Sequence, residues 1–175
     1  MPEGPNQSGY RVEALDSQKH TREGFSCGIE PLDRYLREQA GQDARKRVAA
    51  PFVLCEDESN VVLGYYTLSA LSLDVGDWPE DVVRKLPRYP FVPATLLGRL
   101  ALDERQRGKG LGEYLLMHAL HRALVTSREV ASFAVIVDAK DGRALSFYSR
   151  YEFLPLPDQQ RRLFLPMATI EKLFP

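Results

Sequence analysis

The stretch from Leu96 to Ala123 decides the fold, and in one-letter code it reads LLGRLALDERQRGKGLGEYLLMHALHRA. An apolar run leads into a basic turn with a glycine at every second position, and the turn leads into a segment of helical periodicity. The apolar positions of that segment are Leu111, Leu115, Leu116, Ala119, Leu120 and Ala123. A strand, a glycine loop and a helix in this order present backbone N–H groups to a phosphate. We therefore predict that the loop holds the pyrophosphate of a coenzyme.

A glycine loop alone is weak evidence, because a surface turn before a helix has the same composition. Here the loop follows a strand and opens a helix, and Arg105, Arg107 and Lys109 complement the charge of a phosphate. The loop is not a Walker A motif, since no Lys-Ser or Lys-Thr pair follows it. It is not a dinucleotide fingerprint either, because no acidic residue ends a second strand about 20 residues further on.

The composition is that of one globular domain. The 175 residues can bury a sizeable core, and the formal net charge of −1 shows no global basic excess. Basic residues nevertheless gather in three segments, which makes local basic faces possible on a near-neutral molecule. These segments contain Arg34, Arg37, Arg45, Lys46 and Arg47; Arg84, Lys85 and Arg88; and Arg99, Arg105, Arg107 and Lys109.

Cysteine spacing and apolar patterning bear on the compartment. Cys27 and Cys55 are far apart and form no CxxC motif, so we expect two free thiols in a reducing cytoplasm and no metal site. No apolar run approaches the roughly 18 residues of a membrane span, and the N-terminus has no signal-peptide pattern. Residues 1–9 are expected to be loose.

Elements along the chain alternate between strand and helix patterns, which predicts an α+β or α/β fold whose sheet has helices on both faces. Strands are expected at 10–15, 52–55, 61–73, 96–102, 131–137, 153–156 and 162–165. Helices are expected from Pro31 to Ala40, at 80–85, from Leu111, at 143–150 and at 168–174. Gly64 inside a strand indicates a bulge or a close approach, and the long proline-rich connection 74–93 is of a kind that is often functional.

The glycine loop also carries a family resemblance. Arg107–Gly112 resembles the Arg/Gln-x-x-Gly-x-Gly/Ala motif of the GCN5-related N-acetyltransferases (GNAT). From about Phe25 to Phe174 the chain is similar to one subgroup, the acetyltransferase toxins of bacterial type II toxin–antitoxin modules. The similar segments are 25–28, 32–36, 64–69, 98–103, 137–141 and 144–148. The resemblance implies a single GNAT domain over 1–175, with a central mixed, mostly antiparallel twisted sheet.

The resemblance also implies a coenzyme site for acetyl-CoA. In the family, the amides of the motif bind the pyrophosphate, and the strand before it pairs with the pantetheine arm like an added strand. By this analogy the strand residues are Leu100, Ala101 and Leu102, and the loop residues are Arg107, Gly108, Lys109, Gly110, Leu111 and Gly112. A backbone N–H of the strand would polarise the thioester carbonyl.

Tyr148 matches the family's tyrosine that lies beside the coenzyme sulfur and acts as general acid. A phenol with an ordinary pKa of about 10 is protonated at neutral pH and can donate its proton. Helical periodicity alone favours an ordinary core aromatic at this position. His20, His118 and His121 are candidates for a general base only by residue type, and water can accept the proton from a weakly basic amine.

One position departs from the family pattern. Members read Phe-Tyr-x-x-x-Gly-Phe after the last core helix, whereas this chain has Glu152 in place of the glycine. If the position requires a positive φ, the side chain costs on the order of 1 kcal/mol.

The resemblance implies the α-amine of aminoacyl-tRNA as acceptor, blocked translation as outcome, and a homodimer with a small ribbon-helix-helix antitoxin as the assembly. Arg47, Arg88 and Arg99 are candidates for contacts to the tRNA, although each alone could equally be a solvated surface charge. Two other hypotheses stay open. The protein could acetylate a small amine or a protein N-terminus, or it could be a non-catalytic acyl-CoA-binding module.

Overall fold

The computed structural model describes residues 4–175. By their contacts these residues form two compact units, and each is described by itself. The first unit comprises the chain up to Ser69 together with Gly98–Arg122, and the second comprises Ala70–Leu97 together with Ala123–Pro175. The N-terminal segment expected to be loose lies partly outside the described residues, at 1–3. Residues 4–9 form coil and a turn before the first strand.

Seven strands form one sheet in the order β1-β2-β3-β4-β5-β7-β6. The pairs β1–β2, β2–β3, β5–β7 and β6–β7 are antiparallel, whereas β4 and β5 run parallel. The mixed, mostly antiparallel sheet predicted from the sequence is therefore confirmed. The strands are β1 Tyr10–Ala14, β2 Ala50–Glu56, β3 Gly64–Asp74, β4 Phe91–Leu102, β5 Ala134–Asp138, β6 Leu154–Leu156 and β7 Gln159–Pro166.

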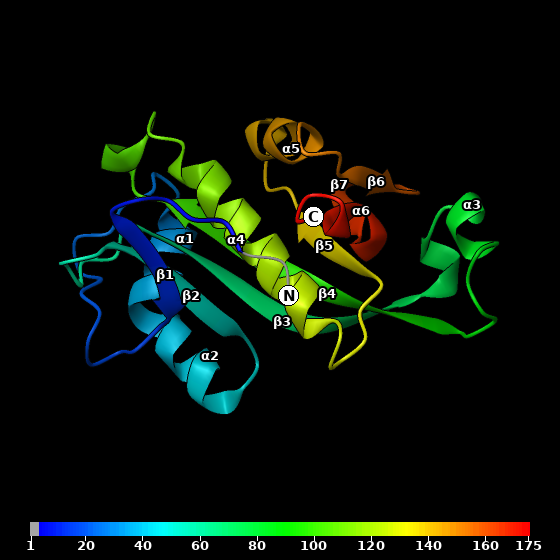
Figure 1. Cartoon of the computed structure of the whole chain (residues 1–175), viewed down its shortest axis with the longest axis horizontal. Helices are drawn as coiled ribbons and strands as arrows, with labels where there is room; N and C mark the ends of the chain where they lie inside the picture. The colour runs from blue at the N-terminus through cyan, green and yellow to red at the C-terminus, as the bar shows by residue number, and fades with distance from the viewer. Residues whose placement is uncertain (1–3) are drawn as a thin grey trace. The chain divides into compact units, whose positions relative to one another are not determined.

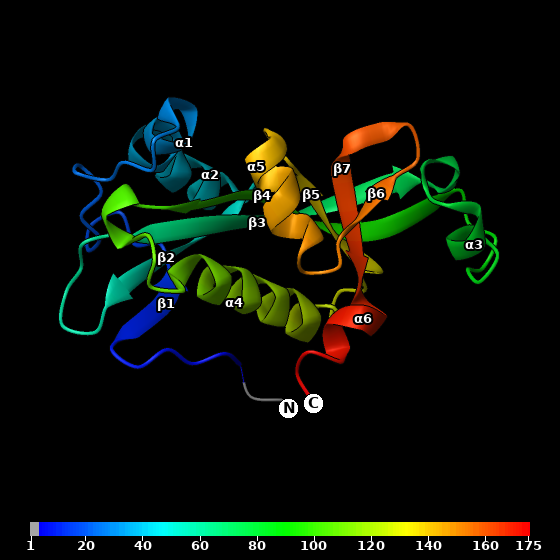
Figure 2. The same cartoon turned by 90° about the horizontal axis from the view of Figure 1, so that it is seen from above.

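Helices cover both sides of the strands in the first unit. The helices α1 Glu30–Arg34, η1 Tyr35–Gln39 and α2 Ala40–Lys46 lie on one side of β1–β3, and α4 Leu111–Thr126 lies on the other (Figure 2). The predicted helix thus continues through Gly41, and its middle turn η1 has π-helical geometry. Beneath α1–α2 lies an apolar core made of Phe25, Cys27, Leu32, Tyr35, Leu36, Ala40, Val53, Cys55, Val62, Tyr65 and Ala101.

The helix α4 begins where the glycine loop predicted it. All six residues of its expected apolar stripe are at most 2% exposed. Gly64 of β3 marks a close approach, as predicted, because a Cβ there would lie 2.7 Å from Leu115 Cδ1 and 3.0 Å from the carbonyl oxygen of Ala101. The missing side chain lets α4 and the end of β4 pack directly on β3, and this packing fixes the start of α4.

The second unit has its own core. It holds the short helices α3 Glu80–Val83, α5 Gly142–Ser149 and α6 Met167–Glu171, together with the turn η2 Val75–Asp77. One cluster of its buried apolar residues is made of Leu73, Trp78, Val92, Ala94, Ala134, Ile136, Leu156 and Phe164. The strand β4 begins at Phe91, earlier than the apolar run that predicted it, since residues 91–94 alternate between exposed and buried side chains despite Pro93.

No helix within residues 4–175 is both long enough and apolar enough to cross a membrane.

Candidate active site

The predicted coenzyme loop connects β4 to α4 in the first unit (Figure 1). After Asp103 comes the short turn η3 Glu104–Gln106, and α4 begins at Leu111. Gly108 and Gly110 have φ of 82° and 75°, in the left-handed region where a side chain is strained. A Cβ built at Gly108, Gly110 or Gly112 would meet no atom of the described chain within 4 Å. Packing within the chain therefore does not explain the glycine at position 112.

The loop presents hydrogen-bond donors at the start of a long helix. The backbone N–H of Tyr114 donates to the carbonyl of Gly110 at 3.1 Å, which is the first bond of the helical ladder. The N–H groups of Leu111, Gly112 and Glu113 precede that bond and have no acceptor inside the helix. The helix dipole adds a partial positive charge at the same end. Such an end can bind an anionic group through backbone atoms alone.

The three cations around the loop are not equivalent. The guanidinium of Arg105 donates to both carboxylate oxygens of Asp103 at 2.9 Å and to the carbonyl of Gly24 at 2.9 Å. Arg107 lies 3.8 Å from a carboxylate oxygen of Glu104, and Lys109 donates to the side chain of Gln106 at 3.0 Å. Both of these side chains belong to exposed residues. The sequence analysis predicted that all three cations complement the charge of a phosphate. In the structure, Arg105 links the loop to Asp103 and Gly24, and we call this set of hydrogen bonds the brace.

Asp103 is the anchor of this brace. It is 1% exposed and accepts hydrogen bonds from the backbone N–H groups of Ser26 and Arg105, at 3.1 and 2.9 Å, besides those of the guanidinium. The hydrogen bonds from Arg105 lower the pKa of Asp103 to about 2. The N–H of Glu104 returns a bond to the carbonyl of Ser26 at 2.9 Å. This role of Asp103 was not predicted from the sequence.

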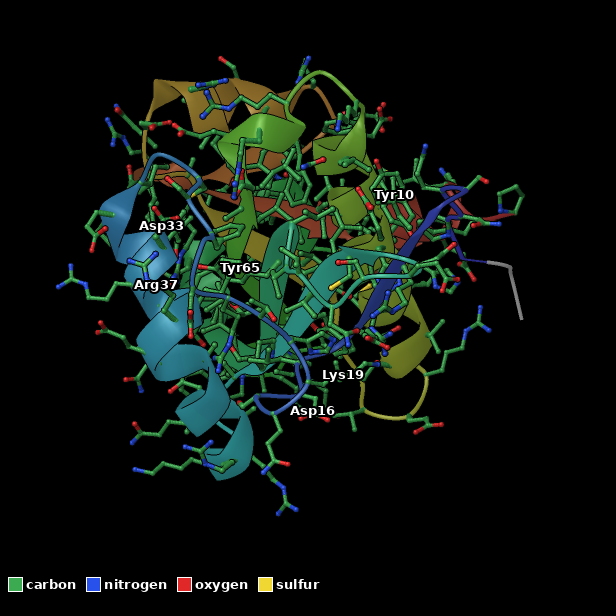
Figure 3. All side chains as sticks on the ribbon, turned by 90° about the vertical axis from the view of Figure 1, so that its left-hand side faces the viewer. Tyr10, Asp16, Lys19, Asp33, Arg37 and Tyr65 are labelled. Carbon is green, nitrogen blue, oxygen red and sulfur yellow. The ribbon has the colours of Figure 1, made fainter. Side chains whose placement is uncertain are left out.

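A second buried carboxylate ties the same segment to α1. Asp33, 5% exposed, accepts a hydrogen bond from the N–H of Cys27 at 2.8 Å. Figure 3 places Asp33 and Arg37 on the helical segment and Tyr65 on the strand beside it. The hydroxyl of Tyr65 donates to the carbonyl of Leu32 at 2.7 Å. The coenzyme loop, residues 24–28 and the start of α1 are thus joined by a continuous series of hydrogen bonds.

The three strand residues predicted to align the coenzyme end β4. Ala101 is 6% exposed and belongs to the core, whereas Leu100 and Leu102 are partly exposed. Directly after them, the N–H of Asp103 donates to the carbonyl of Leu63 at 2.8 Å. This bond fixes the point where the strand turns into the loop.

Tyr148 lies on α5 in the second unit. The carboxylate of Asp141 caps that helix by accepting from the N–H of Ala144 at 2.8 Å. Tyr148 is 7% exposed, and its ring packs edge-on against Phe147 and Phe153 at centroid distances of 5.3 and 5.4 Å. Burial raises the pKa of its phenol above the ordinary value. The phenol is therefore protonated at neutral pH and can act as a proton donor.

The turn after α5 has the conformation that the family pattern suggested. Glu152 has a φ of 70°, so the condition for strain at this position is met. The N–H of Glu152 donates to the carbonyl of Ser149 at 3.2 Å, and the N–H of Phe153 donates to that of Tyr148 at 3.4 Å. The chain keeps the left-handed turn without the glycine.

Two of the three histidines are held in their own networks. His20, 5% exposed, accepts from the N–H of Asp16 at 2.9 Å through Nδ1, so Nε2 carries the proton toward Glu13 at 2.8 Å. Nδ1 of His118 lies 2.9 Å from the hydroxyl of Tyr66, and burial lowers the pKa of His118 to about 4. Both arrangements are those of structural histidines rather than of a general base.

The three predicted tRNA contacts differ in their surroundings. Arg47 is exposed and ends α2 with a φ of 58°. The guanidinium of Arg99 lies 3.5 Å above the ring of Tyr35, whose hydroxyl donates to Asp43 at 2.8 Å. These residues belong to the first unit, whereas Arg88 is exposed in the second. Arg99 is thus oriented by its neighbours, which the sequence did not indicate.

Both cysteines are buried free thiols, and burial raises the pKa of each to about 11. Within residues 4–175 no group of three or more His, Cys, Asp or Glu side chains could hold a metal ion.

Comparison with known proteins identifies the class to which this fold and loop belong. The model of the acetyltransferase (GNAT) family matches residues 19–153, and the chain belongs to that family. It is 32% identical over 169 residues, 93% of each chain, to a probable toxin TacT from Sinorhizobium fredii (strain NBRC 101917 / NGR234). It is 34% identical over 166 residues to a tRNA-acetylating toxin from Mycobacterium tuberculosis (strain ATCC 25618 / H37Rv), with 95% of this chain and 98% of that protein covered.

Solved structures agree with these relatives. AtaT complexed with acetyl-methionyl-tRNAfMet matches with a TM-score of 0.87 and 30% identity, covering 95% of this chain and 99% of that one. A mutant AtaT toxin bound to the C-terminus of the antitoxin AtaR and to acetyl-CoA matches with a TM-score of 0.81 and 28% identity, at the same coverage. The GNAT fold expected from the glycine motif is therefore confirmed, and its relatives are acetyltransferase toxins.

Proposed function

We propose that this protein is the toxin of a bacterial type II toxin–antitoxin module. It transfers the acetyl group of acetyl-CoA to the α-amino group of an aminoacyl-tRNA and thereby blocks translation. The observation that carries the proposal is the likeness over 95% of the chain to AtaT complexed with acetyl-methionyl-tRNAfMet. The protein acts in the cytoplasm as a single-domain enzyme and homodimer, and its partner is a small ribbon-helix-helix antitoxin.

The coenzyme is held mainly by backbone atoms. The amides of Arg107–Gly112 bind the pyrophosphate of acetyl-CoA, and the side chains of Arg107 and Lys109 add positive charge. Support comes from the left-handed glycines and from the helix N–H groups that have no acceptor inside α4. The end of β4, Leu100–Leu102, pairs with the pantetheine arm, and a strand N–H polarises the thioester carbonyl.

The chemistry requires one proton donor. The neutral amine attacks the thioester carbonyl carbon, a C–N bond forms, and the C–S bond breaks. The phenol of Tyr148 gives its proton to the leaving thiolate, and water takes the proton that the amine loses. Burial supports this role because it keeps the phenol protonated. Structural neighbours of this chain include KacT and AtaT mutants in which a tyrosine is replaced by phenylalanine.

The acceptor side requires contacts to the tRNA. Arg47, Arg88 and Arg99 contribute cations that contact its phosphates or bases. The stacking of Arg99 on Tyr35 supports a defined position for its guanidinium, since one face is covered and the N–H groups at its edge can still bind an anion.

The decisive experiment combines labelled acetyl-CoA, total charged tRNA and the purified protein. Label is expected on the amino acid of one or a few aminoacyl-tRNAs, and their identity gives the specificity. Label on small amines or protein N-termini instead of tRNA would show an ordinary acetyltransferase.

Tyr148→Phe separates catalysis from binding. The variant is expected to bind acetyl-CoA with nearly unchanged affinity, to lose at least about 100-fold in transfer rate, and to relieve growth arrest on expression. Tyr151→Phe is the matched control, because it removes a phenolic hydroxyl from the same segment. It is expected to leave acetyl-CoA affinity, transfer rate and growth arrest unchanged. If Tyr148→Phe stays fully toxic, the protein acts as a non-catalytic acyl-CoA-binding module.

A further inference from the structure

Two exposed aromatic side chains stand in a basic segment of the second unit. Tyr89 is 67% and Phe91 57% exposed, and within residues 4–175 they are the aromatic members of the exposed large hydrophobic residues. Residues 84–93 contain three cations and no acidic residue. The cations are Arg84, Lys85 and Arg88, all of them exposed. We call these five side chains the aromatic platform.

The platform is carried by an anchored backbone. Trp78 is 3% exposed and packs edge-on between Phe133 and Phe164, at centroid distances of 5.3 and 5.4 Å. The partly buried apolar residues of the same connection pack against this core, namely Val75, Val82, Val83 and Leu86.

Hydrogen bonds also hold the backbone beside both aromatic residues. The N–H of Val75 donates to the carbonyl of Pro90 at 2.9 Å, and the N–H of Phe133 donates to that of Pro93 at 2.9 Å. The long connection 74–93 therefore has a fixed backbone, and the two large rings that it exposes beside three cations form a candidate interaction surface.

We propose that the aromatic platform binds unpaired nucleotides of the RNA substrate. The rings of Tyr89 and Phe91 stack on bases, and the three cations contact the adjoining phosphates. Aromatic side chains next to basic ones suit single-stranded RNA, because every base offers a π-face and every nucleotide carries a negative charge. The proposal rests on the proposed function, which supplies an RNA with a single-stranded 3′ end and with loops.

The charge pattern favours RNA over a second copy of this chain. A two-fold interface would bring three cations of one copy against the same three of the other, with no acidic residue in 84–93 to offset them. The carboxylate of Glu80 lies 3.7 Å from Arg84, but both side chains are largely exposed, at 92% and 77%. Such surface pairs are weak, so a polyanion can displace Glu80.

The test compares acetyl transfer by the wild type and by the double variant Tyr89→Ala/Phe91→Ala. The variant is expected to raise KM for charged tRNA at least about tenfold, with kcat and KM for acetyl-CoA unchanged, because stacking on even one base is lost. Tyr89→Phe keeps the ring and is expected to retain wild-type KM. Val130→Ala, which truncates another exposed apolar side chain (70% exposed), is the control for non-specific effects.

Two substrates locate the unpaired bases. If a charged acceptor-stem minihelix shows the same rise in KM as full tRNA, the platform binds the single-stranded 3′ end. If only full tRNA shows it, the platform binds a loop elsewhere in the tRNA. An unchanged KM for both RNAs overturns the proposal. The proposal is also overturned if light scattering shows a monomeric double variant and a dimeric wild type, because the rings would then belong to an interface between copies.

Failure of the platform can be distinguished from failure of the proposed function. If the wild type acetylates no charged tRNA, the proposed function is wrong, and binding of a labelled single-stranded RNA oligonucleotide still tests the platform directly. The wild type is expected to bind it at least about tenfold more tightly than the double variant, with affinity falling as salt rises. Equal affinity for both proteins overturns the platform whatever the enzyme acetylates.

Discussion

The coenzyme loop of the first unit and the turn after Tyr148 in the second unit use different residues to reach the left-handed region of backbone space. In the coenzyme loop the residues are Gly108 and Gly110, with φ of 82° and 75°, whereas the turn after Tyr148 places Glu152 at 70°. The second turn only redirects the chain, and its hydrogen bonds from Glu152 and Phe153 hold it despite the strain. In the proposed function, the first turn brings backbone N–H groups against the pyrophosphate of acetyl-CoA. The difference teaches that glycine is required where the backbone itself is the binding surface.

Gly110→Asp should therefore have the largest effect. The substitution adds a side chain at a φ of 75° and a negative charge beside the proposed pyrophosphate. We expect acetyl-CoA affinity to fall by at least about 100-fold, measured by isothermal titration calorimetry, while the protein still folds because a Cβ at this position meets no atom of the described chain within 4 Å. Gly110→Ala is the control that strains the backbone without adding charge. Unimpaired binding by the aspartate variant would remove the pyrophosphate from this loop.

Gly112→Ala tests the same comparison without strain. Gly112 lies in the first turn of α4, its φ is not in the left-handed region, and a Cβ there meets nothing in the described chain. Alanine is a better helix former, so the free energy of unfolding should rise by up to about 1 kcal/mol. We nevertheless expect acetyl-CoA affinity to fall about tenfold, because the methyl group occupies space that the coenzyme needs. A stabilised variant with unchanged affinity would show that the coenzyme does not approach this residue closely.

Asp103→Asn tests the brace behind the coenzyme loop. The pKa of Asp103 is lowered to about 2 in the folded protein, below its ordinary value near 4, so its stabilisation is complete above about pH 4. It is lost as the pH falls through about 2 and amounts to about 2 kcal/mol. The wild type should therefore be more stable than the variant at pH 7, and the gap should narrow between pH 4 and 2 in urea unfolding. A gap that does not change with pH would contradict the charged brace.

Glu13→Gln is the matched control for that experiment. Hydrogen bonds from His20, Lys19 and Arg11 lower the pKa of Glu13 to about 2 as well. The wild type should therefore be more stable than this variant at pH 7, and that gap should narrow over the same pH range. Glu13 lies on β1, away in sequence from the coenzyme loop. Acetyl-CoA affinity should therefore weaken in Asp103→Asn and stay unchanged in Glu13→Gln.

The periodicity of apolar residues and the positions of glycines predicted the elements of this molecule that depend on residues close together in the chain. The strand, glycine loop and helix from Leu96 to Ala123 were predictable because the apolar periodicity and the positions of the glycines are visible in the sequence. Gly64 was predictable as a close approach because it is a glycine inside a predicted strand. The strands that became β2 and β3 and the helix that became α5 were also predictable from short-range patterns.

Contacts between distant segments could not be predicted in this way. Asp103 is joined to Ser26, Arg99 lies above Tyr35, and His118 contacts Tyr66, and each pair is far apart in the chain. The local sequence does not show whether Arg105 pairs with Asp103 or with a phosphate, because an arginine in a polar loop suits either partner. The π-helical turn η1 is likewise invisible in a pattern that fits an ordinary helix. Such pairings are set by the tertiary fold and not by the residues next to them in the chain.

Glu152→Gly should have the smallest effect, and it tests the comparison of the two turns at the turn after Tyr148. Replacing the strained residue with glycine at a φ of 70° should raise the free energy of unfolding by about 1 kcal/mol, less the backbone entropy that glycine adds to the unfolded chain. Transfer activity should stay within about twofold, since the hydrogen bonds of this turn come from backbone atoms that the substitution retains. Asp158→Gly, at another left-handed residue with φ of 60°, is the control for a gain unrelated to Tyr148. A large change in rate for Glu152→Gly alone would mean that this turn adjusts Tyr148, and the contrast between a binding turn and a redirecting turn would then fail.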